Sequence, residues 1–409
     1  MILSARHFVS FALAALAFCG CSDDETSTPA DGSLLDPPAA GRGVQLRMTT
    51  VIDPGVEVEQ CQFFRAPSEG LNIQRDEVRF TAGSHHVLVY LTPYAELPTK
   101  DELGAAIDPS RPFDCSDGPT ARWRVSTLIG GSQNATGDSI VEFPEDVAMK
   151  VPAGAVLLVN AHYINSSPSP IEPEVRVNLH SIPDAQMRAE GGLLFWYDPF
   201  IRVGAHAASR AAMSCPLASD IELSNAQSHM HRRGIGYTAD HVAPDGSRAQ
   251  IYQNTSWADV PVQRWQDPLA IPAGSRIEYA CSYQNDEDRI VWQGPRTSDE
   301  MCMFIASYWP ADPQTSLCAS DPDDPLGTQD LAADWIGDGD AGCAQTLGCV
   351  QTASSEAEDQ DEAFRGVTEC VLAARPESSE LVSDVVRCLF VSNDPATQCQ
   401  AQMQACQED

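Results

Sequence analysis

Basic residues are scarce in this sequence. The chain has 25 Lys and Arg against 58 Asp and Glu, which gives a formal net charge of -33. Binding to nucleic acid phosphates or to anionic lipid headgroups needs a basic surface, so we exclude nucleic acid as a partner and expect no direct electrostatic binding to a membrane. The charge favours a soluble protein.

Long apolar runs are missing beyond the first residues. The run Phe8 to Cys19 is too short to span a bilayer but suits a secretory signal, which we predict over residues 1–21. Gly20 before Cys21 resembles a bacterial lipoprotein processing site, with Cys21 as the lipid acceptor; an ordinary cleaved signal is the alternative. We therefore expect an exported protein, lipid-anchored at a bacterial envelope (periplasm or cell surface) or otherwise secreted, that meets a membrane only through its anchor.

CxxC pairs are absent, which argues against a tetrathiolate zinc site. The chain has 14 cysteines. Setting aside Cys19 in the signal and Cys21 as the lipid acceptor leaves an even number, which suits disulfides in an oxidising compartment. These cysteines fall into one group between residues 61 and 318 and a second group between residues 343 and 406.

The chain is too long for one ordinary core, and its 29 Pro and 27 Gly are spread among short alternating apolar runs. This pattern predicts a mostly β protein. The turn Val151-Pro-Ala-Gly-Ala155 is echoed by Ile271-Pro-Ala-Gly-Ser275, which indicates two similar β-domains in tandem. Helical spacing over residues 355–373 and 377–391 predicts a small disulfide-linked helical module at the end. The predicted organisation is a signal (1–21), a flexible linker (22–43), two β-domains (44–185 and 186–320), an acidic linker (321–341) and a Cys-rich helical module (342–409).

Histidine is also rare, with nine in the chain, and five of them fall in three tight contexts. His229 and His231 flank one methionine. On a strand, residues two apart project from the same face about 7 Å apart, so both imidazoles can reach one metal ion. An HxH pair alone is a weak signal, and a surface or core pair is the alternative.

His85 and His86 are adjacent, so on a regular strand they would point to opposite faces. Both can bind one metal only at a strand end or a bulge, for which Ala82-Gly83-Ser84 offers an irregular entry. His162, near the end of an apolar run, could supply a third nitrogen. For each histidine alone, a hydrogen-bonded core or surface role is the alternative.

Met301 would add a soft thioether to His229 and His231. A set of two imidazoles and one thioether favours Cu(I) over zinc. A methionine at a strand start more often fills core space, which is the alternative reading of Met301.

Taken together, four motifs in order resemble the copper type II, ascorbate-dependent monooxygenases, which include peptidylglycine α-hydroxylating monooxygenase and dopamine β-monooxygenase. The resemblance covers roughly residues 44–320, and the Asp-Glu-Met-Cys string is its most specific part. The motifs are Ser84-His-His-Val-Leu-Val-Tyr90, Asn160-Ala-His-Tyr163, His229-Met-His231 and Thr297-Ser-Asp-Glu-Met-Cys302.

The resemblance implies two tandem jelly-roll-like antiparallel β-sandwich domains with one copper ion on each. His85, His86 and His162 would hold the copper that stores and delivers an electron. His229, His231 and Met301 would hold the copper that binds O2 and abstracts hydrogen from a substrate C–H bond. A solvent-filled cleft would separate the two ions, and ascorbate or a similar one-electron reductant would reload them.

The resemblance also implies disulfides and a substrate preference. The implied pairs are Cys61 with Cys115, Cys215 with Cys318, and Cys281 with Cys302. In the peptide-processing members an Arg, an Asn and a Tyr hold a substrate carboxylate, where this chain has Gln227, Met303 and Ile305. We therefore expect a small neutral or apolar substrate rather than a glycine-extended peptide.

Three hypotheses of function follow. The first is an enzyme that hydroxylates a C–H bond with O2 and two copper ions. The second is a non-catalytic copper-binding surface lipoprotein, acting as a carrier or a sensor. The third is a disulfide-rich structural or adhesion lipoprotein whose histidines bind no metal; metal analysis separates it from the other two.

Overall fold

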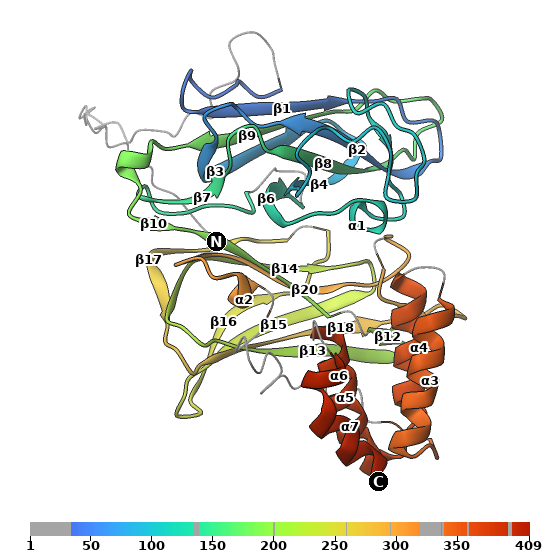
Figure 1. Ribbon diagram of the computed structural model, residues 1–409. Coiled ribbons are helices and arrows are strands. Elements are labelled where there is room, and N and C mark those ends of the chain that lie inside the picture. Colours follow the sequence, from blue (N-terminus) through green and yellow to red (C-terminus); the bar gives the residue numbers. More distant parts are fainter. Residues whose placement is uncertain are drawn as a thin grey trace, which may run out of the picture. The chain divides into compact units, whose positions relative to one another are not determined.

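The described part of the chain is mostly antiparallel β-structure, as predicted (Figure 1). None of its helices is long and apolar enough to cross a membrane. The predicted signal, Cys21, and most of both predicted linkers lie outside the described residues. The computed structural model describes residues 34–133, 139–198, 201–258, 260–294, 296–316, 318, 337, 339–357, 360–391 and 395–409.

Strands β1 to β10, called here the first half, form two five-stranded sheets. Their orders are β1-β9-β3-β7-β10 and β5-β2-β8-β4-β6. Apolar side chains from both sheets, such as Ile73, Val78 and Leu157, share one buried core. The elements are β1 (Gly43–Thr49), β2 (Glu57–Arg65), β3 (Leu71–Phe80), β4 (Ser84–Leu91), β5 (Phe113–Asp114), α1 (Pro119–Arg122), β6 (Thr127–Ser132), β7 (Val147–Val151), β8 (Val156–Ile164), β9 (Glu174–Ser181), η1 (Asp184–Gln186) and β10 (Ala189–Glu190).

Strands β11 to β20, the second half, form two four-stranded sheets and one short pair. The orders are β11-β20-β14-β17, β13-β18-β15-β16 and β12-β19. A second buried core contains aromatic side chains such as Tyr237, Tyr279 and Phe304. The elements are β11 (Gly192–Tyr197), β12 (Arg202–Val203), β13 (Ala208–Pro216), β14 (Ile221–Met230), β15 (Gly234–Val242), β16 (Arg248–Asn254), β17 (Gln263–Ile271), β18 (Arg276–Gln284), β19 (Val291–Trp292), β20 (Cys302–Trp309) and α2 (Pro313–Ser316).

Strand β20 is buried along its whole length because its two faces pack against different cores. Met303 and Ile305 belong to the core of the first half, whereas Phe304 and Tyr308 belong to the core of the second half. This alternation follows from the two-residue period of a strand. The two halves are therefore joined by a shared apolar layer, and the domain boundaries at residues 185 and 320 remain predictions.

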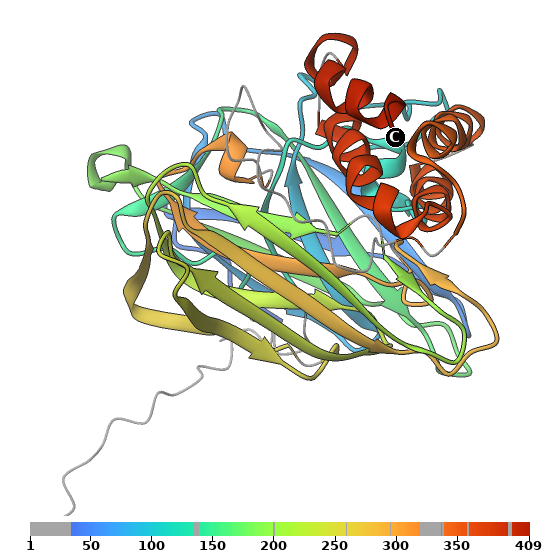
Figure 2. The same cartoon turned by 90° about the horizontal axis from the view of Figure 1, so that it is seen from below.

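The helices that follow residue 342 gather into one cluster (Figure 2). Three disulfides tie them together: Cys343–Cys406, Cys349–Cys370 and Cys388–Cys399. Their apolar centre includes Val350, Val371 and Val385. The elements are α3 (Cys343–Glu356), α4 (Gln360–Leu372), η3 (Pro376–Ser378), α5 (Ser379–Val391), α6 (Pro395–Gln398) and α7 (Gln400–Gln407).

The single helix predicted over residues 355–373 was wrong in its extent. Helix α3 ends at Glu356, and the chain is extended at Ala357 before α4 begins at Gln360. Helix α3 was not predicted because its apolar residues show little helical spacing and Gly348 lies near its centre. Disulfides to α4 and α7 supply much of what holds it in place.

Candidate copper centre

His85, His86 and His162 form a cluster at the ends of the neighbouring strands β4 and β8. Their ligand nitrogens all lie within 4.8 Å of one another. His86 pairs directly with His162 across the two strands, and the register shifts between Ser84 and His86. That bulge frees the two adjacent histidines from strict alternation, so both rings face His162. The geometry predicted for a bulged entry to the strand is therefore present.

The three imidazoles are held in their neutral form. Burial, followed by the nearby His162, lowers the pKa of His85 to about 4. Burial also lowers the pKa of His86 and of His162 below the ordinary value of 6.5. A neutral imidazole keeps a lone pair for a metal ion, so this cluster is ready to bind a metal at neutral pH without first losing protons.

Glu57 fixes the orientation of the His162 ring. Its Oε1 lies 3.0 Å from His162 Nε2, and because a carboxylate can only accept, Nε2 carries the proton. This leaves His162 Nδ1 as the free ligand nitrogen. Thr297 of the second half also donates hydrogen bonds to Glu57. A hydrogen-bonded second layer of this kind orients metal ligands in proteins.

The second histidine pair lies where β14 ends. The rings of His229 and His231 are 5.1 Å apart between centroids, and His231 is the first residue beyond the strand. His229 Nδ1 lies 2.8 Å from Gln133 Oε1, and His231 Nδ1 lies 3.1 Å from the Asp299 carbonyl oxygen. Since both partners accept hydrogen bonds, both histidines present Nε2 as the free nitrogen.

Met301 directly precedes β20 rather than starting it. The first residue of that strand, Cys302, pairs with Met230, which lies between the two histidines. The segment before Met301 touches His231, because the Glu300 carboxylate accepts the His231 backbone N–H at 3.1 Å. Tyr283 further holds this segment by donating its hydroxyl to the Met301 carbonyl at 2.7 Å. The fold thus brings Met301 to the end of β14.

The two histidine groups meet each other. The rings of His86 and His229 lie edge to face with centroids 6.3 Å apart. The expectation of a solvent-filled cleft between the two predicted sites is wrong here, since this contact leaves no room for water between these rings. The physical reason is the shared apolar layer of β20, which draws the halves together. Trp257 of the second half also stacks on His85 of the first half, with centroids 5.6 Å apart.

Residues 205–327 match the family model described as the C-terminal domain of copper type II ascorbate-dependent monooxygenases. This stretch contains His229, His231 and Met301. A human relative, putative DBH-like monooxygenase protein 2, is 25% identical over 261 residues. Residues 205–327 therefore resemble the copper type II, ascorbate-dependent monooxygenases. The alignment covers 58% of this chain and 49% of the human protein, so the chain spans about half the length of the curated relative it matches.

Solved structures add little to the family assignment. The major capsid protein of bacteriophage PM2 has a TM-score of 0.25 and 9% identity, covering 65% of this chain and 97% of the capsid protein. A Bacillus subtilis oxalate decarboxylase variant has a TM-score of 0.17 and 8% identity, covering 78% of this chain and 77% of that protein. Similarity at this level carries no conclusion about the fold or chemistry of this chain.

The two β-halves contain the same three disulfides that the resemblance implies: Cys61–Cys115, Cys215–Cys318 and Cys281–Cys302. Cys281 lies on β18 and Cys302 begins β20. The third bridge therefore fixes the residue that follows Met301.

Sequence reasoning missed a buried charge network beside His231. Glu300 is fully buried and accepts the backbone N–H groups of His231 and Arg233. The Arg233 side chain is also buried and pairs with Glu300 and Glu287. Burial raises the pKa of Glu300 to about 7 although Arg233 opposes this. Its position next to Met301 was the available signal, but a surface carboxylate would have looked the same in the sequence.

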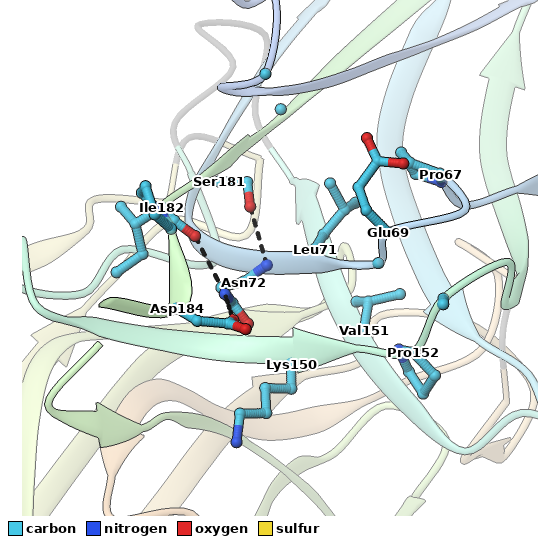
Figure 3. A pocket seen from close by; sticks show the side chains of 15 residues that line it. Pro67, Glu69, Leu71, Asn72, Lys150, Val151, Pro152, Ser181, Ile182 and Asp184 are labelled. Atoms are coloured by element: carbon cyan, nitrogen blue, oxygen red, sulfur yellow. Dashed lines mark hydrogen bonds between the residues drawn. The ribbon is translucent and has the colours of Figure 1, made fainter. Parts of the chain in front are cut away.

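A pocket of about 550 Å³ lies in the first half of the protein, but none of the predicted ligands lines it (Figure 3). Lys150 and Asp184 line it, and Asn72 donates a hydrogen bond to Asp184 at 2.6 Å. Asn72 also donates to the Ile182 carbonyl. Asn72 and Asp184 bind each other and Lys150 pairs with Glu190 at 3.2 Å, so this pocket is a poor candidate for the reaction.

Proposed function

We propose that this protein is a copper-dependent monooxygenase that hydroxylates a C–H bond of a small substrate, using O2 and ascorbate or a similar one-electron reductant. The observation that carries the proposal is the cluster of His85, His86 and His162, whose ligand nitrogens lie within 4.8 Å of one another in a chain whose residues 205–327 match the monooxygenase family model. Neutral imidazoles that converge in this way can donate their lone pairs to one metal ion, which would offset the cost of burying them.

One copper ion would be held by His85, His86 and His162, and a second by His229, His231 and Met301. Bound copper supplies one-electron redox chemistry and a place for O2 to react. The chain supplies the nitrogen donors: His162 through Nδ1, because Glu57 occupies its Nε2, and His229 and His231 through Nε2. The softer thioether at the second site would favour the reduced ion that reacts with O2.

The chain also controls water and charge at these sites. His86, His162 and His231 are each less than one tenth exposed, so the protein rather than solvent surrounds most of both sites. His85 and His229 are partly exposed, and they give the cluster its contact with the outside. We propose that reductant and substrate approach from this side.

The substrate is proposed to be a neutral or apolar small molecule. Gln227 stands where peptide-processing members have a carboxylate-binding arginine, and it carries no charge. Its amide oxygen accepts a hydrogen bond from Gln133 at 2.6 Å. Met303 and Ile305 are almost fully buried and pack into the core of the first half. These side chains offer a substrate carboxylate no cation, which supports a substrate other than a glycine-extended peptide.

The test is metal analysis combined with oxygen uptake. The full chain loaded with copper should hold two ions and consume O2 when ascorbate and a suitable neutral compound are present. Met301→Ile should lose the second ion and the uptake, whereas Met48→Ile, at a buried methionine of β1, should keep both. A chain that binds no copper refutes the proposal, and copper binding without any uptake would favour a carrier or sensor.

The disulfides indicate export, and we propose a lipid anchor at Cys21 as the means of retention at the envelope. Labelling with a radioactive fatty acid should mark the parent chain and leave a Cys21→Ala variant unlabelled. A parent chain that takes up no label would instead support an ordinary cleaved signal.

A further inference from the structure

Gln133 crosses from one half of the molecule to the other. It follows β6 of the first half, yet its side chain forms hydrogen bonds with three residues of β14 in the second half, and the residue is only 6% exposed. Its Oε1 lies 2.8 Å from His229 Nδ1. Its Nε2 donates to Gln227 Oε1 at 2.6 Å and to the Ser228 carbonyl at 2.7 Å.

These contacts fix which way the amide points. The Ser228 carbonyl can only accept a hydrogen bond, so the amide nitrogen of Gln133 must face it. The amide oxygen then faces His229, and an amide oxygen can only accept. His229 must therefore carry its proton on Nδ1, which leaves Nε2 as the ligand nitrogen. A glutamine of the first half thus selects the tautomer of a histidine of the second half.

The backbone around Gln133 is itself held. The buried Asp76 carboxylate accepts the Gly131 N–H at 2.5 Å and the Val141 N–H at 3.0 Å, on either side of Gln133 in the sequence. The first bond is made to β6 itself, and the second to the connection between β6 and β7. The side chain of Gln133 therefore starts from a fixed backbone, as a residue that orients a metal ligand requires.

We propose that Gln133 is a positioning residue for the second copper site, so that this site takes its full affinity only when the two halves are packed together. The inference rests on the proposed function, because it assumes a copper ion at His229, His231 and Met301. The dependence is reciprocal: Trp257 of the second half stacks on His85, and Thr297 donates to Glu57, which orients His162. Each site is completed by a side chain of the opposite half.

The experiment titrates Cu(I) into the full chain in competition with bicinchoninate, a chromophoric chelator. It is run on the parent and on a His162→Ala background, in which only the second site should remain. Leucine has a similar volume but forms no hydrogen bonds. Gln133→Leu should therefore lower the affinity of the second site for Cu(I) by about 10- to 100-fold and leave the affinity of the first site unchanged. Gln62→Leu is the matched control, because Gln62 lies on β2 and donates to Ser110 away from the histidines.

Gln133→Glu separates tautomer selection from simple packing. A carboxylate still accepts the hydrogen bond from His229 Nδ1–H, but both hydrogen bonds that the Gln133 amide nitrogen donates are lost. We expect its second-site affinity to lie closer to the parent than to Gln133→Leu, and the His229 Nδ1–H resonance to persist in proton NMR of both the parent and Gln133→Glu. In Gln133→Leu this resonance should disappear through exchange with water.

The outcomes are distinct. If Gln133→Leu melts like the parent and binds both ions as tightly, the inference is wrong and the proposed function stands. If Gln133→Glu loses as much affinity as Gln133→Leu and also loses the resonance, tautomer selection is wrong. If the parent binds no copper, the proposed function itself is refuted.

Discussion

The imidazoles of His86 and His229 lie edge to face with ring centroids 6.3 Å apart, although they come from different halves of the chain. Each belongs to a different predicted copper site. The two predicted sites are therefore in direct contact, and we expect a change at one site to alter the other.

Removing His162 should abolish the first site. In His162→Ala the remaining His85 and His86 have only two imidazoles to offer, so we expect copper content to fall from two ions to one and oxygen uptake to stop. Atomic absorption on dialysed protein measures the content. His180→Ala is the control, because His180 pairs with Glu77 at 3.1 Å on the outer sheet and should change neither quantity. An unchanged copper content in His162→Ala would contradict the assignment.

The disulfide next to Met301 should matter for copper as well as for stability. Replacing Cys281 and Cys302 by Ser removes a bridge with a sequence separation of 21 and should lower the free energy of unfolding by about 3 kcal/mol. The double replacement should also lower the copper affinity of the second site, because the disulfide at residue 302 holds the neighbouring Met301 in place. Guanidinium unfolding and Cu(I) competition measure the two effects.

The helical module offers a matched bridge for comparison. Cys349–Cys370 also has a sequence separation of 21 but lies away from Met301 in the chain. Its double Ser variant should lose a similar amount of stability and keep both copper affinities. Equal losses of copper affinity in the two variants would show that Cys281–Cys302 has no specific role at the site.

The contribution of the buried histidines to the stability of the metal-free protein should be lost as the pH falls toward 4. Burial and neighbouring histidines lower the pKa of His85 and His229 to about 4, against 6.5 for a free imidazole. Between these values the unfolded chain binds more protons than the folded one, so the stability is complete above about pH 6.5 and is lost below it. Each of these two imidazoles contributes up to about 3 kcal/mol to this loss.

Buried carboxylates work in the opposite direction. Burial raises the pKa of Glu59, Asp76 and Glu300 to about 7, so their contribution to stability decreases as the pH rises from about 4.5 to about 7. The measurement is therefore a difference: urea unfolding of the parent and of His85→Asn across this range. The variant should show a smaller loss at low pH, and identical pH profiles would contradict the lowered pKa of His85.

Trp257 should report on the first copper site. Its indole stacks on His85 with centroids 5.6 Å apart, and Cu(II) quenches a fluorophore this close. Copper addition should therefore quench part of the tryptophan emission, and Trp257→Phe should remove that part. Trp265→Phe, at a partly buried tryptophan of β17, should retain it. Quenching that is unchanged in Trp257→Phe would place the copper elsewhere.

Sequence reasoning found the strands whose apolar pattern is simple and missed those whose polar residues are buried. The apolar run of residues 155–164 predicts a strand, and β8 covers Val156–Ile164. In contrast, the apolar residues Ile221 to Leu223 predict only the start of β14, which extends to Met230. Ser224 and Asn225 interrupt the apolar pattern, but both are used in the interface: Ser224 donates to the Glu142 carbonyl and Asn225 accepts from the Ser307 N–H.

The candidate ligands were predictable because imidazole and thioether groups are rare, chemically distinctive and grouped in short motifs. The residues that orient these ligands were not predictable from the sequence. Gln133 and Glu57 lie far in the sequence from His229 and His162, and neither residue type is unusual at a strand end. Nothing in a single sequence marks a glutamine as the partner of one particular histidine.

The sequence by itself determined the donor chemistry: five histidines in three motifs, one methionine before a cysteine, and the cysteines that brace them. Only the tertiary structure decided how the donors meet. The bulge before His86, the tautomer of His229 and the contact between the two histidine groups all depend on packing between strands that are remote along the chain. Such packing is set by the sum of many buried contacts on both faces of β20, and a local pattern contains only one side of each contact.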